Sequence, residues 1–254
     1  MNIYLFARDG DTTRLLYNYL EDHLWVTAVI LEKDPSKKTF LSKRIKRLGL
    51  LMVISQLLFI LFILPFLKFK SKKRRRLILL KNNLNIGHIP KAKIISVENI
   101  NQFRFKINPP ADSIIIVNGT RILAPSLIKY IKIPMINIHT GITPLFRGVH
   151  GGFWAMASGN LELFGTTIHK IDKGIDTGKV ILQKTTNPLK MDNYSTYYLL
   201  QYAIILPELI EILKIYSQNQ TLQEVKPLTL ESKIWSHPTI CQWIRYSLNK
   251  HKFE

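Results

Sequence analysis

Cysteine is nearly absent from this chain, and acidic residues are scarce. The 254 residues contain one cysteine, Cys241, so no disulfide can form within the chain. This fits a reducing compartment, and we expect Cys241 to be a small, buried apolar residue. The apolar run at residues 1–7 is too short for a secretory signal peptide, and no basic residues precede it.

The chain is strongly basic, but the charge is local. Lys and Arg number 36 against 17 Asp and Glu, which gives a formal net charge of +19. Residues 41–76 contain eleven basic residues and no acid. A basic cluster, rather than a basic surface throughout, therefore needs an explanation, and anionic membranes and nucleic acids are the partners to weigh.

An uncharged stretch lies inside this basic segment. Residues 49–67 hold only two polar side chains, Ser55 and Gln56. A helix of this length spans about 30 Å, the thickness of a bilayer core. A buried core helix is the alternative, but flanking Lys and Arg suit anionic headgroups. Nucleic-acid binding would predict aromatic residues for stacking; residues 72–76 have none, so we expect no nucleic-acid partner.

Hydrophobic patterning predicts an α/β fold with a mostly parallel sheet flanked by helices. Strands are expected at residues 2–7, 25–31, 93–97, 113–118, 135–139, 165–170 and 179–183. Helices are expected at residues 11–21, 98–103, 125–130, 149–158 and 194–217, the first with Asp11 or Thr12 as its cap and the fourth closed by Gly159.

The predicted organisation is a catalytic domain at 1–217, interrupted by a membrane-associating insert at 41–76, and a tail at 218–254. The tail is expected to carry Trp235, Trp243 and Tyr246 on a basic helix. Strands before and after the insert belong to one sheet, so a single membrane crossing would separate them. We therefore expect a monotopic element, bent at Pro65, at the cytoplasmic face of the membrane.

Three polar side chains follow short apolar runs and suit attack of an amine on a carbonyl carbon. They are Asn137, His139 and Asp176. An Asn N–H stabilises a developing oxyanion. A His donates to it or shuttles a proton, and an Asp sets the protonation state of the His.

The surrounding motifs carry a family resemblance. They are Asn137-Ile138-His139-Thr140-Gly141, Phe146-Arg147-Gly148-Val149-His150-Gly151, Gly165-Thr166-Thr167-Ile168-His169 and Asp172-Lys173-Gly174-Ile175-Asp176-Thr177-Gly178. This pattern resembles the formyltransferases that use 10-formyltetrahydrofolate, densely between residues 111 and 213. Members include glycinamide ribonucleotide transformylase, methionyl-tRNA formyltransferase and bacterial amino-sugar N-formyltransferases.

The resemblance implies a Rossmann-like formyltransferase fold, direct transfer to an amine, and no metal. It places Asn137 and His139 around the formyl oxygen, with Asp176 assisting proton transfer. It assigns the folate slot to Arg121, Ile122, Leu123, Ile171, Asp172 and Ile175, although residues 121–123 also suit plain strand-to-helix packing. Arg147 and His150 are expected to touch the acceptor, and His169 to be structural.

Three departures from the family bear on the acceptor. The ribotide enzyme holds a phosphate on a glycine-rich turn, whereas this chain has carboxylates there, at Asp9 and Asp11. A serine after the catalytic His is replaced by Gly141. Residues after 218 are too few for the β-barrel of the tRNA enzyme. We therefore expect an amino sugar, linked to a nucleotide or a lipid; glycinamide ribotide and a non-catalytic membrane-bound folate-binding scaffold are the alternatives. Related enzymes often pair through C-terminal helices, so a homodimer is left open.

Overall fold

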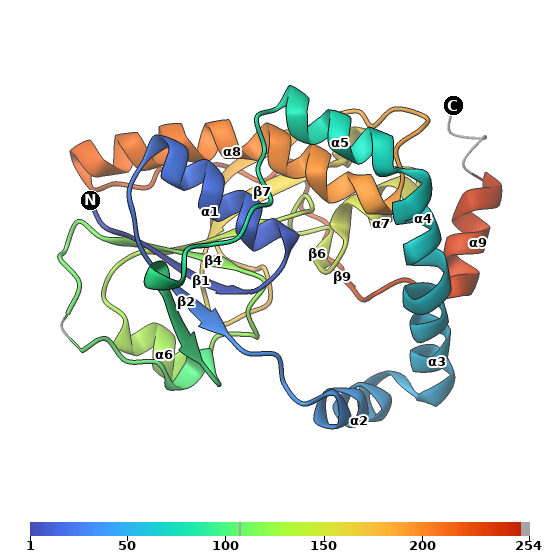
Figure 1. Ribbon diagram of the computed structural model, residues 1–254, viewed down its shortest axis with the longest axis horizontal. Coiled ribbons are helices and arrows are strands. Elements are labelled where there is room, and N and C mark those ends of the chain that lie inside the picture. Colours follow the sequence, from blue (N-terminus) through green and yellow to red (C-terminus); the bar gives the residue numbers. More distant parts are fainter. Residues whose placement is uncertain (107, 250–254) are drawn as a thin grey trace.

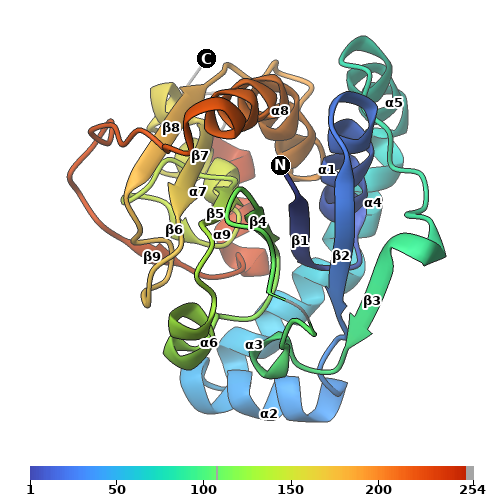
Figure 2. The ribbon, with the colours of Figure 1, turned by 90° about the vertical axis from the view of Figure 1, so that its left-hand side faces the viewer.

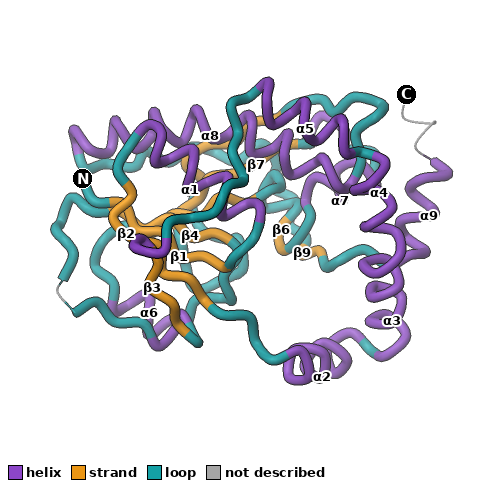
Figure 3. Tube along the Cα trace, in the orientation of Figure 1, coloured by secondary structure: helices purple, strands orange, loops and turns teal. Residues whose placement is uncertain are grey.

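A seven-stranded sheet forms the centre of the molecule in the computed structural model, which describes residues 1–106 and 108–249 (Figures 1 and 3). The strand order is β3-β2-β1-β4-β5-β7-β8. The strands of this sheet are β1 (Ile3–Arg8), β2 (Val26–Glu32), β3 (Ile94–Val97), β4 (Ile114–Asn118), β5 (Met135–His139), β7 (Gly165–Lys170) and β8 (Val180–Thr185). Each predicted strand is confirmed to within about two residues.

The first five strands in this order are parallel, and β7 and β8 run antiparallel to their neighbours. Strand β4 is buried at every position, as its unbroken Ile-Val run predicts for a central parallel strand. The carboxyl ends of β4 and β5 meet where the order reverses beside β1, which is the usual location of ligands in open α/β sheets. The predicted fold class is therefore confirmed.

Helices cover both faces of the sheet (Figure 2). Leu15, Leu16 and Leu20 of α1 pack with α8 on one face, and Leu127 of α6 packs on the other. The helices of this part are α1 (Asp11–His23), α6 (Pro125–Tyr130), α7 (Gly151–Ala157) and α8 (Tyr194–Asn219), with short 3-10 turns at Lys91–Lys93, Ile100–Gln102 and Leu161–Leu163. The predicted cap of α1 was wrong: Gly10 occupies that position and no side chain caps the helix.

A helical arm, residues 37–81, connects β2 to β3 and extends beyond the predicted insert at both ends. It consists of α2 (Lys37–Leu48), α3 (Leu50–Leu58), a π-type turn (Phe59–Ile63), α4 (Leu64–Lys70) and α5 (Lys72–Lys81). The N–H of Leu64 bonds to the carbonyl of Phe59, five residues back. This wider turn directly precedes Pro65, which has no N–H to donate, so the helix continues through the proline.

The α3–α4 run stands at one edge of the molecule (Figure 1). It exposes apolar side chains. Within the described residues it is the one helical run, Leu50–Lys70, that is long and apolar enough to cross a membrane, and 22 % of its most apolar window is buried. The alternative of a buried core helix is therefore wrong. The large apolar side chains that it exposes are Leu50, Leu51, Met52, Ile54, Leu57, Leu58, Leu61, Phe62, Phe66 and Phe69.

Two arginines of helix α5 attach this helix to the body of the protein. Arg74 makes two 2.8 Å hydrogen bonds to the fully buried carboxylate of Asp192. Arg75 donates to Asp11 and to the hydroxyl of Tyr198, at 3.2 and 2.8 Å. These two charges belong to internal ion pairs, so the expectation that the whole basic cluster faces a membrane is corrected.

The described part of the predicted tail, residues 218–249, is integrated into the fold. The short strand β9 (Ile234–Trp235) pairs with β6 (Arg147–Gly148), and α9 (Ile240–Asn249) packs against α3. Trp235 therefore lies on a strand and not on the terminal helix, because Arg147 and Gly148 provide it with a partner backbone. Cys241 is exposed at the start of α9, which corrects the expectation of burial.

Candidate active site

Asn137 and His139 project from the same face of β5 at its carboxyl end. They are two residues apart, and alternate residues of a strand share a face. The strand lies between parallel β4 and antiparallel β7, so its backbone is paired on both sides and holds the two side chains in place. His139 is 6 % exposed, whereas Asn137 is half-buried.

The loop between β7 and β8 contains the third predicted catalytic residue, Asp176. The carboxylate of Asp172 accepts hydrogen bonds from the Thr177 hydroxyl at 2.8 and 2.9 Å, which ties the loop across its base. A Cβ atom at Gly178 would lie 1.7 Å from the carbonyl oxygen of Lys170, so this position requires glycine. The closed loop holds Asp176 with a φ of +49°, in the left-handed region that Asp tolerates better than most residues.

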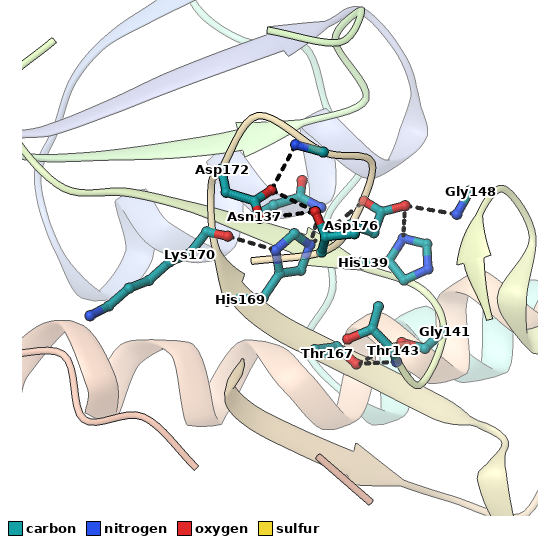
Figure 4. Close-up of polar contacts among 12 residues, drawn as sticks. Asn137, His139, Gly141, Thr143, Gly148, Thr167, His169, Lys170, Asp172 and Asp176 are labelled. Carbon is teal, nitrogen blue, oxygen red and sulfur yellow. Dashed lines mark hydrogen bonds and ion pairs between the residues drawn. The ribbon is translucent and has the colours of Figure 1, made fainter. Parts of the chain in front are cut away.

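Asp176 contacts several other residues of the site (Figure 4). Its Oδ2 accepts from the backbone N–H of Gly148 at 2.7 Å and lies 3.5 Å from Nδ1 of His139. Its Oδ1 lies 3.6 Å from Nε2 of His169. Burial acts to raise the pKa of Asp176, but His139, His169 and the Gly148 N–H together outweigh it, so the pKa is well below its ordinary value. The carboxylate is therefore charged at neutral pH.

His169 also belongs to this site. The antiparallel register of β5 and β7 sets it directly opposite Asn137, whose Nδ2 donates to Nε2 of His169 at 3.1 Å. The Nδ1 of His169 donates to the carbonyl of Lys170 at 2.8 Å. We predicted that His169 would be a structural residue. Its hydrogen bond to Asn137 orients the Asn137 amide. Only the cross-strand register reveals this contact, and register cannot be read from the spacing of two separate motifs.

The loop that follows β5 folds tightly against His139. The Nε2 of His139 donates to the carbonyl of Phe146 at 2.6 Å. A Cβ atom at Gly141 would lie 2.6 Å from that carbonyl and 3.0 Å from Cα of Gly151. A serine at position 141 therefore has no room here, which accounts for the glycine that departs from the family pattern.

Gly148 connects the site to the C-terminal part of the chain. Its φ is +94°, and a Cβ atom there would lie 2.3 Å from the carbonyl oxygen of Trp235. This close approach of β6 and β9 aims the Gly148 N–H at Asp176. The ring of Trp235 stacks on Trp154 at 4.5 Å, which fixes β9 against α7.

The residues predicted to bind folate lie on both sides of the site. Arg121 is not free, because its guanidinium and backbone N–H both contact the buried carboxylate of Glu32. Leu123 is buried in the apolar cluster on the α6 face, as the alternative of plain strand-to-helix packing predicted. Ile122, between them, is 59 % exposed.

The other predicted folate residues come from the loop that carries Asp176. Ile171 packs against the same apolar cluster as Leu123, and Ile175 is half-buried. The carboxylate of Asp172 accepts the hydrogen bonds that close the loop, so its role is structural. Ile122, Ile171 and Ile175 are thus the apolar surfaces left at this end of the sheet.

The two predicted acceptor residues lie beyond β5 on the side of α7. Arg147 is on β6, and its buried Nε has no hydrogen-bond partner among the described residues. His150 precedes α7 with a φ of +60° and contacts His237. In the described residues no group of His, Cys, Asp and Glu is arranged to hold a metal ion.

Residues 96–200 match a family model described as formyl transferase. This part of the chain, which carries Asn137, His139 and Asp176, is therefore similar to formyl transferases. A curated methionyl-tRNA formyltransferase from Koribacter versatilis (strain Ellin345) is 34 % identical over 97 residues, which is 38 % of this chain and 31 % of that relative. The chain therefore matches about a third of the length of that relative.

Solved structures of formyltransferases share the fold. An N-formyltransferase from Helicobacter canadensis, in complex with folinic acid and dTDP-3-aminofucose, has a TM-score of 0.51 at 17 % identity, covering 92 % of this chain and 71 % of that one. A phosphoribosylglycinamide formyltransferase from Anaplasma phagocytophilum has a TM-score of 0.53 at 13 % identity, covering 92 % and 97 %. The predicted formyltransferase fold is confirmed.

Proposed function

We propose that this formyltransferase transfers the formyl group of 10-formyltetrahydrofolate to the primary amine of an amino sugar. The observation that carries the proposal is the meeting of Asn137 and His139 with a charged Asp176 at the carboxyl end of β5. A charged, buried carboxylate next to the His139 imidazole is suited to stabilise that ring while it takes a proton from an attacking amine.

The chemistry requires one new bond, one broken bond and one proton transfer. The amine nitrogen bonds to the formyl carbon, the bond from that carbon to the folate nitrogen breaks, and a proton moves from the amine to the leaving nitrogen. The Asn137 amide supplies an N–H group for the developing negative charge on oxygen, and Asp176 stabilises a positive charge on His139. His169 and the Gly148 N–H orient Asn137 and Asp176.

The residues at the end of the sheet fit a flat heterocycle. Ile122 is exposed beside the closed loop that carries Ile171 and Ile175, which gives apolar surface on two sides. When bound, 10-formyltetrahydrofolate supplies the electrophilic formyl carbon. The Helicobacter canadensis structure contains folinic acid, which supports a folate at this fold.

The first turn of the sheet argues against glycinamide ribotide. Arg8 pairs with Glu32 at 3.0 Å, and Asp9 is held by Arg14 at 2.9 Å. Asp11 is covered by Arg75 from the arm. Every charge at this turn is therefore matched internally, and a phosphate would meet two carboxylates at a helix N-terminus.

The arm supports attachment to an anionic membrane surface. Its apolar face is exposed along α3 and α4, and exposed Lys43 and Lys46 precede it while Lys68 and Lys70 end it. In the described part of the chain none of these lysines forms an ion pair within the protein. An interfacial helix with basic flanks fits a lipid surface, with the catalytic domain on the cytoplasmic side.

A formyl-transfer assay on detergent-purified protein tests the proposal. One arm offers nucleotide-linked amino sugars and the other glycinamide ribotide, each with 10-formyltetrahydrofolate. We expect transfer to the sugar, and a loss of about 10²–10⁴-fold in Asp176→Asn. Asp22→Asn, an exposed carboxylate on α1, is the matched control and should match the parent.

Transfer to the ribotide alone would refute the amino-sugar acceptor. Folate binding without transfer to either acceptor, unchanged by Asp176→Asn, would favour the non-catalytic scaffold instead.

A further inference from the structure

A cluster of nitrogen-rich side chains lies beside the site and includes residues of the arm. Arg44 of α2 donates from Nε and Nη2 to Oε1 of Gln56 on α3, at 3.0 and 2.7 Å. Gln56 is 1 % exposed and donates from Nε2 to the carbonyl of His237 at 2.6 Å. Nδ1 of His237 and Nε2 of His150 are 2.9 Å apart. The cluster therefore joins the arm, the segment between β9 and α9, and the loop before α7.

The cluster has no counter-charge. In the described part of the chain no carboxylate contacts Arg44, His150 or His237. Burial lowers the pKa of His150, with His237 and Arg44 adding to the effect, and burial lowers the pKa of His237 to about 4. At neutral pH two uncharged imidazoles therefore flank one guanidinium, and such donors favour an anion with several oxygens.

The cluster is close to the reacting centre and separate from the predicted folate surfaces. His150 directly precedes Gly151, whose Cα packs against Gly141 next to the His139 ring. The aromatic side chains around it, Phe153 and Tyr194, belong with the α7 side of the molecule. Leu123 and Ile171 belong with the other apolar cluster, on the α6 face. An acceptor whose amine reaches the catalytic residues from the α7 side passes this cluster.

A shallow, open apolar hollow lies at the base of the arm. It has a volume of about 550 Å³ and is lined by Leu48, Leu51 and Met52 with Ser55 and Thr239. Ser55 is the neighbour of Gln56, and Thr239 lies two residues beyond His237. The hollow also opens among the exposed apolar side chains of α3. Residues that line the hollow therefore neighbour residues of the cluster in the chain, an arrangement that suits an amphiphile.

We infer that Arg44, His150 and His237 bind the phosphoryl group that links the acceptor sugar to its carrier, and that this carrier is a membrane lipid. The inference rests on the proposed amino-sugar function and names its substrate class. The hydrogen bonds of Arg44 and His237 to Gln56 couple this subsite to the helix whose apolar face is exposed. A lipid phosphate thus has its charged group at the cluster and its hydrocarbon at the hollow.

Binding of small phosphates to the full-length protein in detergent tests the inference without turnover. The probes are decyl phosphate, inorganic phosphate and uridine diphosphate, measured by calorimetry and by the imidazole nitrogen resonances of His150 and His237. We expect decyl phosphate to bind at least tenfold more tightly than inorganic phosphate and to shift both imidazole signals. Arg44→Gln and His237→Gln should each weaken it about tenfold, as for a lost charge-assisted hydrogen bond.

Arg47→Gln is the matched control, since it removes the same charge from an exposed position on the same helix. An equal loss in Arg47→Gln, or no shift of the imidazole signals, would overturn the subsite. Tighter binding of uridine diphosphate than of decyl phosphate would overturn the lipid assignment. Arg44-dependent binding with no formyl transfer to any amino sugar would instead leave the subsite in place and refute the proposed function.

Discussion

Substitution of Gly148 by alanine is expected to damage both stability and catalysis, because this glycine is constrained in two ways. Its φ of +94° is a conformation that L side chains rarely adopt, and a Cβ atom would lie 2.3 Å from the carbonyl oxygen of Trp235. That neighbour is backbone, so it cannot rotate away. Relief of the clash requires β6 and β9 to separate, which moves the Gly148 N–H away from Asp176.

The magnitude follows from these contacts. A left-handed alanine costs about 1–2 kcal/mol, and loss of a hydrogen bond to a charged group costs about 1.5–3 kcal/mol. Gly148→Ala should therefore lower the free energy of unfolding by about 2.5–5 kcal/mol. Gly119→Ala is the control: its φ is +68° but no atom lies within 4 Å of a Cβ there, so only the first cost of about 1–2 kcal/mol applies.

Urea unfolding followed by circular dichroism, in the same detergent for both variants, measures the difference. Formyl transfer on the acceptor found for the parent should fall at least tenfold in Gly148→Ala. Equal stability of the two variants, together with parental turnover in Gly148→Ala, would refute the argument that β9 holds Asp176 through Gly148.

Three further predictions concern charge and the arm. The lowered pKa of Asp176 stabilises the folded state fully above the ordinary carboxyl pKa, near 4, and this stabilisation is lost as pH falls below it; urea titrations at pH 3 and pH 7 should show a smaller pH difference in Asp176→Asn than in the parent. Arg74→Gln leaves the buried Asp192 carboxylate without its two-bonded partner and should cost about 3 kcal/mol, whereas the exposed Arg76→Gln should change unfolding by less than about 0.5 kcal/mol. Leu61→Gln should reduce co-sedimentation with anionic vesicles about tenfold, since Leu61 is 63 % exposed on the arm; an unchanged bound fraction would argue against lipid contact.

The periodicity of the chain was sufficient to predict the sheet. Strand β4 stood out because a buried parallel strand is uniformly apolar. Asn137 and His139 stood out because they are polar residues at the carboxyl end of a short apolar strand, β5. The local pattern did not indicate which distant segments of the chain pair with each other. The contact of His169 with Asn137 depends on antiparallel register, and the contact of Trp235 with Gly148 depends on a two-residue strand inside a segment expected to be a tail.

The basic run at residues 72–76 shows the same limit for charge. All five side chains have the same sign, and nothing in the run separates Arg74 and Arg75 from their neighbours. Their partners, Asp192 and Asp11, are more than 60 residues away in each case. Only the packing of α5 on α8 and α1 reveals that two of these charges are internal.

The orientation of α3 is the strongest argument for a lipid surface next to the arm. In a helix on the surface of a soluble protein, apolar side chains face the core and polar ones face water. Here Gln56 is 1 % exposed, while Leu51 and Leu61 on the same run are 83 % and 63 % exposed. The buried amide is used for hydrogen bonds to Arg44 and the His237 carbonyl, so the helix attaches to the domain partly through polar contacts. Its exposed apolar side chains would be solvated in water at a cost of roughly 1.5–3 kcal/mol each relative to burial, a cost that a bilayer interface removes.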